Sequence, residues 1–193
     1  KLETNSMALV NKISYKSSKN NLRFAVYGGY FSRANYAIGN SQIFNSSAKE
    51  FVTNSKNSGG SFKTAIGFNK NNWITNFRYQ LLYFQNGLPG HTHDSVWELS
   101  SFITPNQTWN YTIPAQKIIN HLVQWENKFY FKNDELIAQL GFTSNDLKEF
   151  GEKLFTPGID MTLQNTSYNV RWKHNFNKYF DVVSGSQGMF QNN

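Results

Sequence analysis

Two histidines and a carboxylate lie close together near the middle of the chain, in the sequence His91-Thr92-His93-Asp94. Residues two apart in an extended segment point to the same side, so both imidazoles would share one face beside the carboxylate. Imidazole nitrogens and carboxylate oxygens are ligands for transition metals. His91, His93 and Asp94 are therefore a candidate metal site, and a polar loop held by its own hydrogen bonds is the alternative.

Aromatic residues also occur in the long polar segments of the chain. Flat rings beside polar groups are suited to binding chelates or sugars. Loops that connect regular elements are where binding residues concentrate. The candidate ligand-binding residues are Tyr36, Trp97, Trp109 and Tyr111.

Enzymatic signatures are absent from the sequence. There is no Gly-x-Ser-x-Gly, no phosphate-binding glycine loop and no His-Glu-x-x-His. The chain has no Cys, which excludes disulfides, thiolate metal sites and a cysteine nucleophile. The sequence predicts a protein that is not an enzyme and that uses no cofactor.

The formal net charge of +7 indicates an acidic partner, either nucleic acid or lipid. No nucleic-acid-binding motif is present. Many lysines lie in or beside predicted turns, where they would meet lipid phosphates, although exposed turns also carry lysine for solubility alone. These lysines are Lys16, Lys19, Lys70, Lys128, Lys132, Lys173 and Lys178.

The elements that must position these residues are strands, and their connections alternate in length. Brief turns at one end and large loops at the other are typical of transmembrane β-barrels. No apolar run reaches the roughly 20 residues that a membrane helix needs. Short polar turns are predicted at 17–21, 69–72, 132–135 and 174–178, and long connections at 33–60, 86–114 and 148–158.

Residues 73–84 show the two faces of such a strand most clearly. Trp73, Thr75, Phe77, Tyr79, Leu81 and Tyr83 would face lipid, whereas Asn76, Arg78 and Gln80 would face a wet lumen. Aromatic residues also flank the short turns, as in the girdle expected at a membrane interface. Further strands are predicted at 22–31, 61–68, 136–142, 159–172 and 179–190.

Two segments also fit a helical pattern. Residues 115–131 follow a proline and carry helically spaced apolar residues, but the alternation from Val123 to Phe131 favours a strand. Residues 145–154 place Leu147, Phe150 and Leu154 at helical spacing, so a short helix is an alternative there.

Eight strands with short turns on the periplasmic side would put both Lys1 and Asn193 on the outer side of the membrane. Complete barrels with an even number of strands have both ends on the periplasmic side. We therefore expect residues 1–193 to form a partial barrel domain.

The stretch from Phe84 to Asp94 resembles the first long barrel loop of TonB-dependent outer-membrane receptors of the Bacteroidetes type. Other segments resemble this family in the same order along the chain. They are Gln116 to His121, Leu140-Gly141-Phe142 with Asn145 and Glu149-Phe150, Pro157 to Leu163, and Gly185 to Met189. The N-terminal part, with Ser32 to Tyr36 and Gly39-Asn40, fits more loosely.

The resemblance implies an up-and-down antiparallel barrel of about 22 strands around a plug. Such a receptor imports a scarce small ligand, such as a metal chelate, across the bacterial outer membrane with energy relayed by TonB. The chain departs from the family because it carries neither a plug nor a TonB-contacting segment. It also has Asp146-Leu147-Lys148 where members often carry Arg.

Two other functions remain open at this point. One is passive diffusion through a porin-like channel without a plug. The other is a soluble β-sandwich that binds carbohydrate, in which a second sheet would have to cover the apolar stripe from Trp73 to Tyr83.

Overall fold

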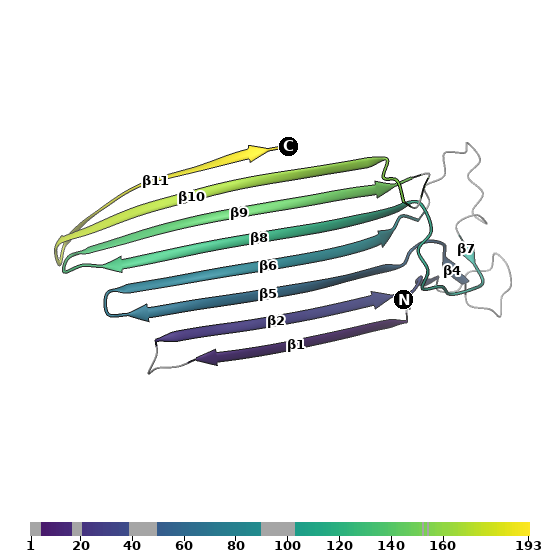
Figure 1. Cartoon of the computed structure of the whole chain (residues 1–193), viewed down its shortest axis with the longest axis horizontal. Coiled ribbons are helices and arrows are strands. Elements are labelled where there is room, and N and C mark those ends of the chain that lie inside the picture. Colours follow the sequence, from purple (N-terminus) through teal and green to yellow (C-terminus); the bar gives the residue numbers. More distant parts are fainter. Residues whose placement is uncertain (1–4, 17–20, 39–49, 90–102, 152, 154) are drawn as a thin grey trace.

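The computed structural model describes residues 5–16, 21–38, 50–89, 103–151, 153 and 155–193. Eight long strands form one antiparallel sheet in which successive long strands are neighbours (Figure 1). In their order across the sheet they are β1 (Ser6–Lys16), β2 (Leu22–Arg33), β5 (Asn57–Lys70), β6 (Trp73–Gly87), β8 (Ala115–Tyr130), β9 (Asp134–Phe150), β10 (Ile159–Asn177) and β11 (Phe180–Asn192).

A second, three-stranded sheet lies beyond one end of the large sheet (Figure 1). It consists of β3 (Ala37–Ile38), β4 (Glu50–Val52) and β7 (Ile103–Thr104) in that order. β3 and β4 belong to the connection between β2 and β5, and β7 to the connection between β6 and β8. The small sheet therefore joins two long connections at one end of the molecule, a feature that the sequence did not predict.

The alternation of short and long connections is confirmed. β5 and β6 are joined by Asn71 and Asn72 alone, and Asn71 has a φ of +51°, which asparagine tolerates better than most residues. β10 and β11 are likewise joined by two residues, Lys178 and Tyr179. The strand ends that are joined by short turns all lie at one end of the sheet, opposite the strand ends that are joined by long connections (Figure 1).

The strands are staggered in one direction across the sheet. Gly67 of β5 and Asn169 of β10 lie in the same cross-strand row. From that row toward the short turns, β5 continues for three residues to Lys70, whereas β10 continues for eight residues to Asn177. The turn end thus shifts five residues over four strand spacings, about 4 Å for every ~4.8 Å across the sheet. The strands are therefore tilted by about 40° from the perpendicular to the line of turns, within the range of roughly 35–45° between strands and barrel axis found in barrels.

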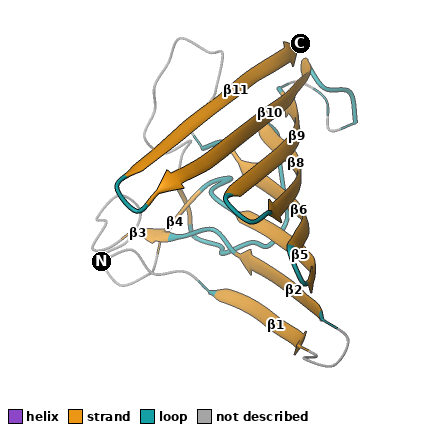
Figure 2. Cartoon of the chain, turned by 90° about the vertical axis from the view of Figure 1, so that its left-hand side faces the viewer, coloured by secondary structure: helices purple, strands orange, loops and turns teal. Residues whose placement is uncertain are grey.

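Viewed along the strands, the sheet curls into an open trough with β1 and β11 at its rims (Figure 2). Each of these two strands pairs with a strand on one side only among the described residues. The all-β antiparallel architecture is therefore confirmed, whereas closure into a barrel of about 22 strands stays a prediction. No helix in the described part of the chain is long and apolar enough to cross a membrane.

The sheet has two chemically different faces because successive side chains point to opposite sides. We call the face that carries Arg23, Asn76 and Glu126 the polar face. The other, the aromatic face, carries Phe77, Trp125 and many other large apolar residues. The predicted alternation along residues 73–84 is confirmed, since Phe77 pairs with Trp125 in one row and Asn76 pairs with Glu126 in the next.

The apolar core is small because the trough is a single layer. Among the described residues only a few apolar side chains are buried, namely Ala34, Ala37, Ile103, Ala115 and Ile137. A soluble domain of this size buries many large apolar side chains. Most of the large apolar residues of this sheet lie on an uncovered face instead.

One helical alternative is wrong and several strand limits differ from those predicted. Residues 145–150 continue β9, where Leu147 pairs with Ile118 of β8 and with Met161 of β10. Residues 115–130 form a strand, as predicted. β5 begins at Asn57 rather than at residue 61, and β10 extends to Asn177 rather than to residue 172.

Candidate functional site

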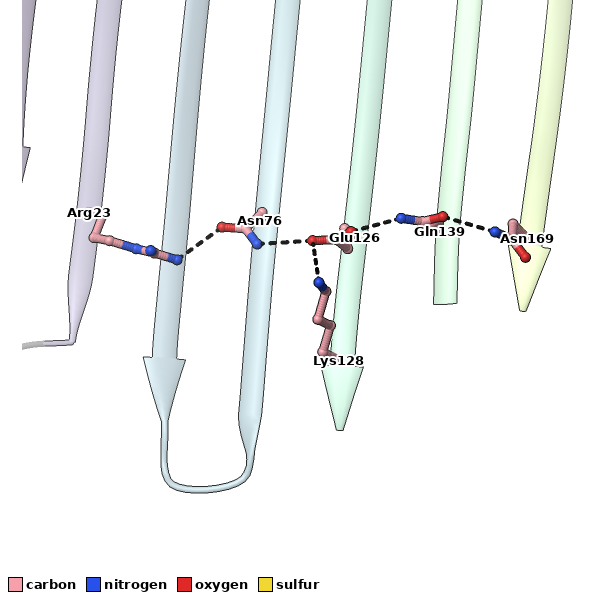
Figure 3. Close-up of polar contacts among 6 residues, drawn as sticks. All are labelled: Arg23, Asn76, Glu126, Lys128, Gln139 and Asn169. Carbon is pink, nitrogen blue, oxygen red and sulfur yellow. Dashed lines mark hydrogen bonds and ion pairs between the residues drawn. The ribbon is translucent and has the colours of Figure 1, made fainter. Parts of the chain in front are cut away.

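Five polar side chains cross the polar face in one line (Figure 3). The strand register places them at the same level, since each pairs directly with the next except that Gly67 lies between the first two. We call this line the polar row. It consists of Arg23 on β2, Asn76 on β6, Glu126 on β8, Gln139 on β9 and Asn169 on β10.

The hydrogen bonds of the polar row all point toward Glu126. On one side, Arg23 Nη2 donates to Asn76 Oδ1 at 3.1 Å, and Asn76 Nδ2 donates to Glu126 Oε1 at 3.3 Å. On the other side, Asn169 Nδ2 donates to Gln139 Oε1 at 3.0 Å, and Gln139 Nε2 donates to Glu126 Oε2 at 2.7 Å. A carboxylate that only accepts hydrogen bonds therefore sets the orientation of every amide in the row.

Gly67 allows the row to extend to β2. A Cβ atom on Gly67 would lie 2.8 Å from Asn76 Oδ1 and 3.2 Å from Arg23 Nε. Any larger side chain would therefore occupy the path along which the Arg23 guanidinium crosses β5. Glycine is unfavourable in a strand interior, so its presence here fits a position that must remain empty.

Lys128 partly balances the charge of Glu126. Its Nζ lies 3.7 Å from Glu126 Oε1, and the two side chains are 31% and 19% exposed. Such a partly exposed ion pair contributes little to stability by itself. The carboxylate thus has two amide donors and one neighbouring ammonium, all on the polar face.

Three hollows open on the polar face, which places it on the inner side of the trough. The largest, of about 550 Å³, lies over the polar row between β6 and β11 and is lined by Glu126, Gln139 and Ser167 among others. The second, of about 240 Å³, extends from β1 to β8, and the third, of about 180 Å³, from β2 to β6. Arg78 lines all three.

The aromatic face carries a continuous apolar band. Its side chains are substantially exposed, for example Ile66 at 50%, Trp125 at 46% and Leu140 at 49%. On β6 the band runs from Trp73 to Tyr83, about 33 Å along the strand, or roughly 25 Å after correction for a tilt of about 40°. This height equals the apolar band of outer-membrane barrels, about 25 Å.

Aromatic side chains contact one another along the short-turn edge of this band. Trp73 stacks on Phe129 with ring centroids 6.2 Å apart and meets Phe68 edge-on at 5.6 Å. Tyr15 stacks on Phe24 at 5.4 Å, and Phe176 contacts Phe180 at 5.5 Å. The aromatic residues predicted to flank the turns thus form contacts at the level of the turns themselves.

At the opposite end, Tyr111 fixes a long connection to the sheet. Its hydroxyl oxygen lies 2.6 Å from Ser58 Oγ and donates to the Gln85 carbonyl oxygen at 2.8 Å. Lys56 Nζ lies 4.1 Å from the centre of the Tyr111 ring and donates to the Trp109 carbonyl oxygen. Burial raises the pKa of Tyr111 and lowers the pKa of Lys56.

The predicted ligand-binding residues lie at this end of the molecule where they are described. Trp109 is 42% exposed. Tyr36 is half-buried, and its backbone N–H donates to Ser55 Oγ at 3.1 Å. Tyr111 uses its hydroxyl and its ring within the chain, as described above. A ligand-binding role for these residues stays a prediction.

The candidate metal ligands His91, His93 and Asp94, together with Trp97, lie outside the described residues. Across the residues for which the structure gives positions, no group of three or more His, Asp or Glu side chains is arranged to hold a metal ion.

The polar row and the hollows are candidate functional features that the sequence predicted only in part. Asn76, Arg78 and Gln80 were assigned to the lumen from the alternation along one strand. Their partners on other strands depend on register, which no local pattern specifies. Gly67 is the sequence feature that could have indicated the polar row, because an isolated glycine in a strand pattern often marks the close approach of another group.

No protein-family model matches the chain, and searches of the curated proteins and of the solved structures find no match either.

Proposed function

We propose that this chain forms part of the wall of a membrane-spanning transport barrel, with the aromatic face toward lipid and the polar face toward a water-filled lumen. The observation that carries the proposal is the exposed apolar band, roughly 25 Å high, on the back of a sheet whose concave side is polar. Apolar outside and polar inside is the reverse of a small soluble barrel.

The two rims of the trough support a larger assembly. Backbone groups at a sheet edge cannot remain unpaired in hydrocarbon, because each would cost several kcal/mol. In a membrane, β1 and β11 must therefore pair with further strands beyond the eight described. This requirement fits the resemblance to TonB-dependent receptors, whose barrels have about 22 strands.

In this proposal the protein resides in a bacterial outer membrane and imports a small, scarce ligand. The long connections joined by the small sheet face the exterior, and the short turns face the periplasm. Outer-membrane lipid covers the aromatic face. A TonB-type complex supplies energy through a plug that fills the lumen.

The two alternatives differ in what the structure would have to contain. A soluble carbohydrate-binding sandwich needs a second sheet against the aromatic face, but the small sheet of the described residues lies beyond the strand ends (Figure 1). A porin-like channel fits the trough equally well. It differs from a receptor in leaving the lumen open.

Tryptophan quenching in vesicles tests the membrane orientation. Trp125 and Trp109 are similarly exposed, at 46% and 42%, but Trp125 lies within the apolar band and Trp109 in a long connection. We expect lipids brominated on their acyl chains to quench a smaller fraction of the tryptophan fluorescence of the full-length chain after Trp125→Phe, and an equal or larger fraction after Trp109→Phe, than in the unsubstituted chain. Quenching by aqueous acrylamide should show the opposite dependence.

Two results would count against the proposal. One is a chain that remains in solution without detergent and does not float with phosphatidylcholine vesicles. The other is equal bromolipid quenching of both variants. Steady ion conductance across planar bilayers would favour the porin-like alternative over a plugged receptor.

A further inference from the structure

Four basic side chains gather on the polar face of the first four long strands. Lys12 of β1 and Lys63 of β5 lie in one cross-strand row, with Tyr27 of β2 between them. Arg78 of β6 lies in the next row toward the turns, and Arg23 of β2 in the row after that. Period-two alternation directs all four toward the inside of the trough.

Small residues in the middle of this group leave a hollow. Ala25 and Ala65 pair directly in the row of Arg78, and their methyl groups fill little of the space between the longer basic side chains. The hollow of about 240 Å³ is lined by Lys12, Lys63 and Arg78. It is adjoined by the hollow of about 180 Å³ that Arg23 and Arg78 line above the same two alanines.

One acidic side chain, Glu126, interacts electrostatically with Arg78, so the four basic side chains keep an excess of positive charge. None of the described residues that line the two hollows is Asp or Glu. Glu126 lines the larger hollow, which Arg78 also lines, and it already accepts hydrogen bonds from Asn76 and Gln139. Among the described residues, the structure gives Arg78 neither a hydrogen bond nor an ion pair. Its guanidinium can therefore bind another anion with up to five N–H donors.

The spacing of the cations sets the kind of anion that fits. Lys63 and Arg78 are diagonal neighbours on adjacent strands, and their Cα atoms are about 7–8 Å apart. Lys12 and Lys63 are two strand spacings apart, roughly 10 Å. Lys12 and Arg78 are three strand spacings and two residues apart, roughly 16 Å. A compact molecule with several anionic groups can therefore contact all three basic side chains with less convergence of those side chains than a single oxyanion would need.

We propose that the polar face of β1, β2, β5 and β6 binds a compact polyanion, with two or more carboxylate or phosphate groups, between Lys12, Lys63 and Arg78. Arg78 provides paired N–H donors for one anionic group, and the two ammonium groups contact the others. The inference rests on the proposed function only for the route of the ligand, which would reach this site through a water-filled lumen. It narrows the transported ligand to an anionic class.

Titration calorimetry on the full-length chain in nonionic detergent micelles tests this site. Citrate and tripolyphosphate serve as separate probes, so that carboxylate and phosphate are distinguished. We expect Arg78→Gln and Lys63→Gln each to weaken binding by about tenfold, as loss of one charge-assisted hydrogen bond predicts. Arg78→Lys should retain more affinity than Arg78→Gln, because it retains the charge.

Arg171→Gln is the matched control, because Arg171 lies on the polar face of β10 outside all three hollows. Its substitution removes the same charge and should change affinity by less than about twofold, as expected for a screened, distant charge. Far-ultraviolet circular dichroism of each variant establishes that the sheet is intact.

The outcomes separate this inference from the proposed function. Binding of either probe that depends on Arg78 and Lys63 supports the site, even if the chain does not float with vesicles. Flotation with vesicles without binding of either probe overturns the site alone. Equal losses for Arg78→Gln and Arg171→Gln also overturn it, because attraction would then follow net charge rather than these residues.

Discussion

The aromatic face and the polar face of this sheet share the same strands and the same backbone hydrogen bonds, yet they are organised by different interactions. On the aromatic face, neighbouring rings contact one another, single hydrogen bonds such as that from Trp125 Nε1 to Thr75 Oγ1 join adjacent strands, and many rings remain exposed. On the polar face, five side chains are joined by directional hydrogen bonds that converge on one carboxylate. A substitution should therefore matter through solvation on one face and through geometry on the other.

A charge on the aromatic face should have the largest effect. Leu140→Arg places a guanidinium in the middle of the apolar band, which should cost about 2–4 kcal/mol if that band contacts lipid. Gln124→Arg, on the polar face of β8, is the control and should cost less, about 0.2–1 kcal/mol, because its new charge lies opposite Arg78. Urea titration of the chain folded into phosphatidylcholine vesicles measures both. Equal midpoints for the two variants would contradict the assignment of the faces.

A side chain at Gly67 should have the next largest effect. Gly67→Val places Cβ within 2.8 Å of Asn76 Oδ1, so the Arg23 side chain is displaced, and a cost of about 1–3 kcal/mol is expected for overpacking. Gly28 of β2 is the control, because a Cβ added there meets no atom within 4 Å. Gly28→Val should leave the urea midpoint unchanged or raise it, since valine favours strands. Similar losses in both variants would contradict a specific role for the gap at Gly67.

Loss of the Tyr111 hydroxyl should have the smallest effect. Tyr111→Phe removes the hydrogen bond to the Gln85 carbonyl oxygen and the contact with Ser58, at a cost of about 1 kcal/mol near neutral pH. Burial raises the pKa of this hydroxyl from its ordinary 10.0, against a smaller opposing effect of the Ser58 hydrogen bond.

The sign of its pH dependence follows from linkage. Because the folded-state pKa is raised, the stabilising contribution of Tyr111 is fully present below pH 10 and is lost as the pH rises through the folded-state value. The difference between wild type and Tyr111→Phe should therefore shrink above pH 10. Urea midpoints at pH 8 and at increasing alkaline pH measure it, and a difference that grows with pH would contradict the raised pKa.

Much of the sheet could be predicted from local alternation. Residues 73–84 carry a regular period of two, and the division of their side chains between two faces of β6 was predicted correctly from it. The start of β5 was missed because Ser58, Gly59 and Gly60 have low strand propensity; they are held in the sheet by pairing with β2 and β6. Tertiary pairing outweighed local preference there.

The end of β9 and the small sheet show a second limit. Leu147 and Phe150 fit a helical spacing, but pairing with β8 and β10 keeps residues 145–150 extended. The strands of the small sheet have two or three residues each, too few for any periodicity to be visible. The pairing of β4 with β7 joins parts of the chain about fifty residues apart.

The candidate site required information that the sequence does not contain locally. Arg23, Glu126 and Asn169 come from three separate strands, and only the register brings them to one level. A shift of one residue in any of these strands would move its polar side chain to the opposite face.

The polar row should also affect how the sheet resists a pulling force. It links β2 to β10 by side chains in series, in addition to the backbone hydrogen bonds, but among the described side chains it reaches neither β1 nor β11. Under a pulling force directed across the strands, the two rim strands should peel away at low load. The six strands between them should then resist as one unit, until a link next to Glu126 breaks.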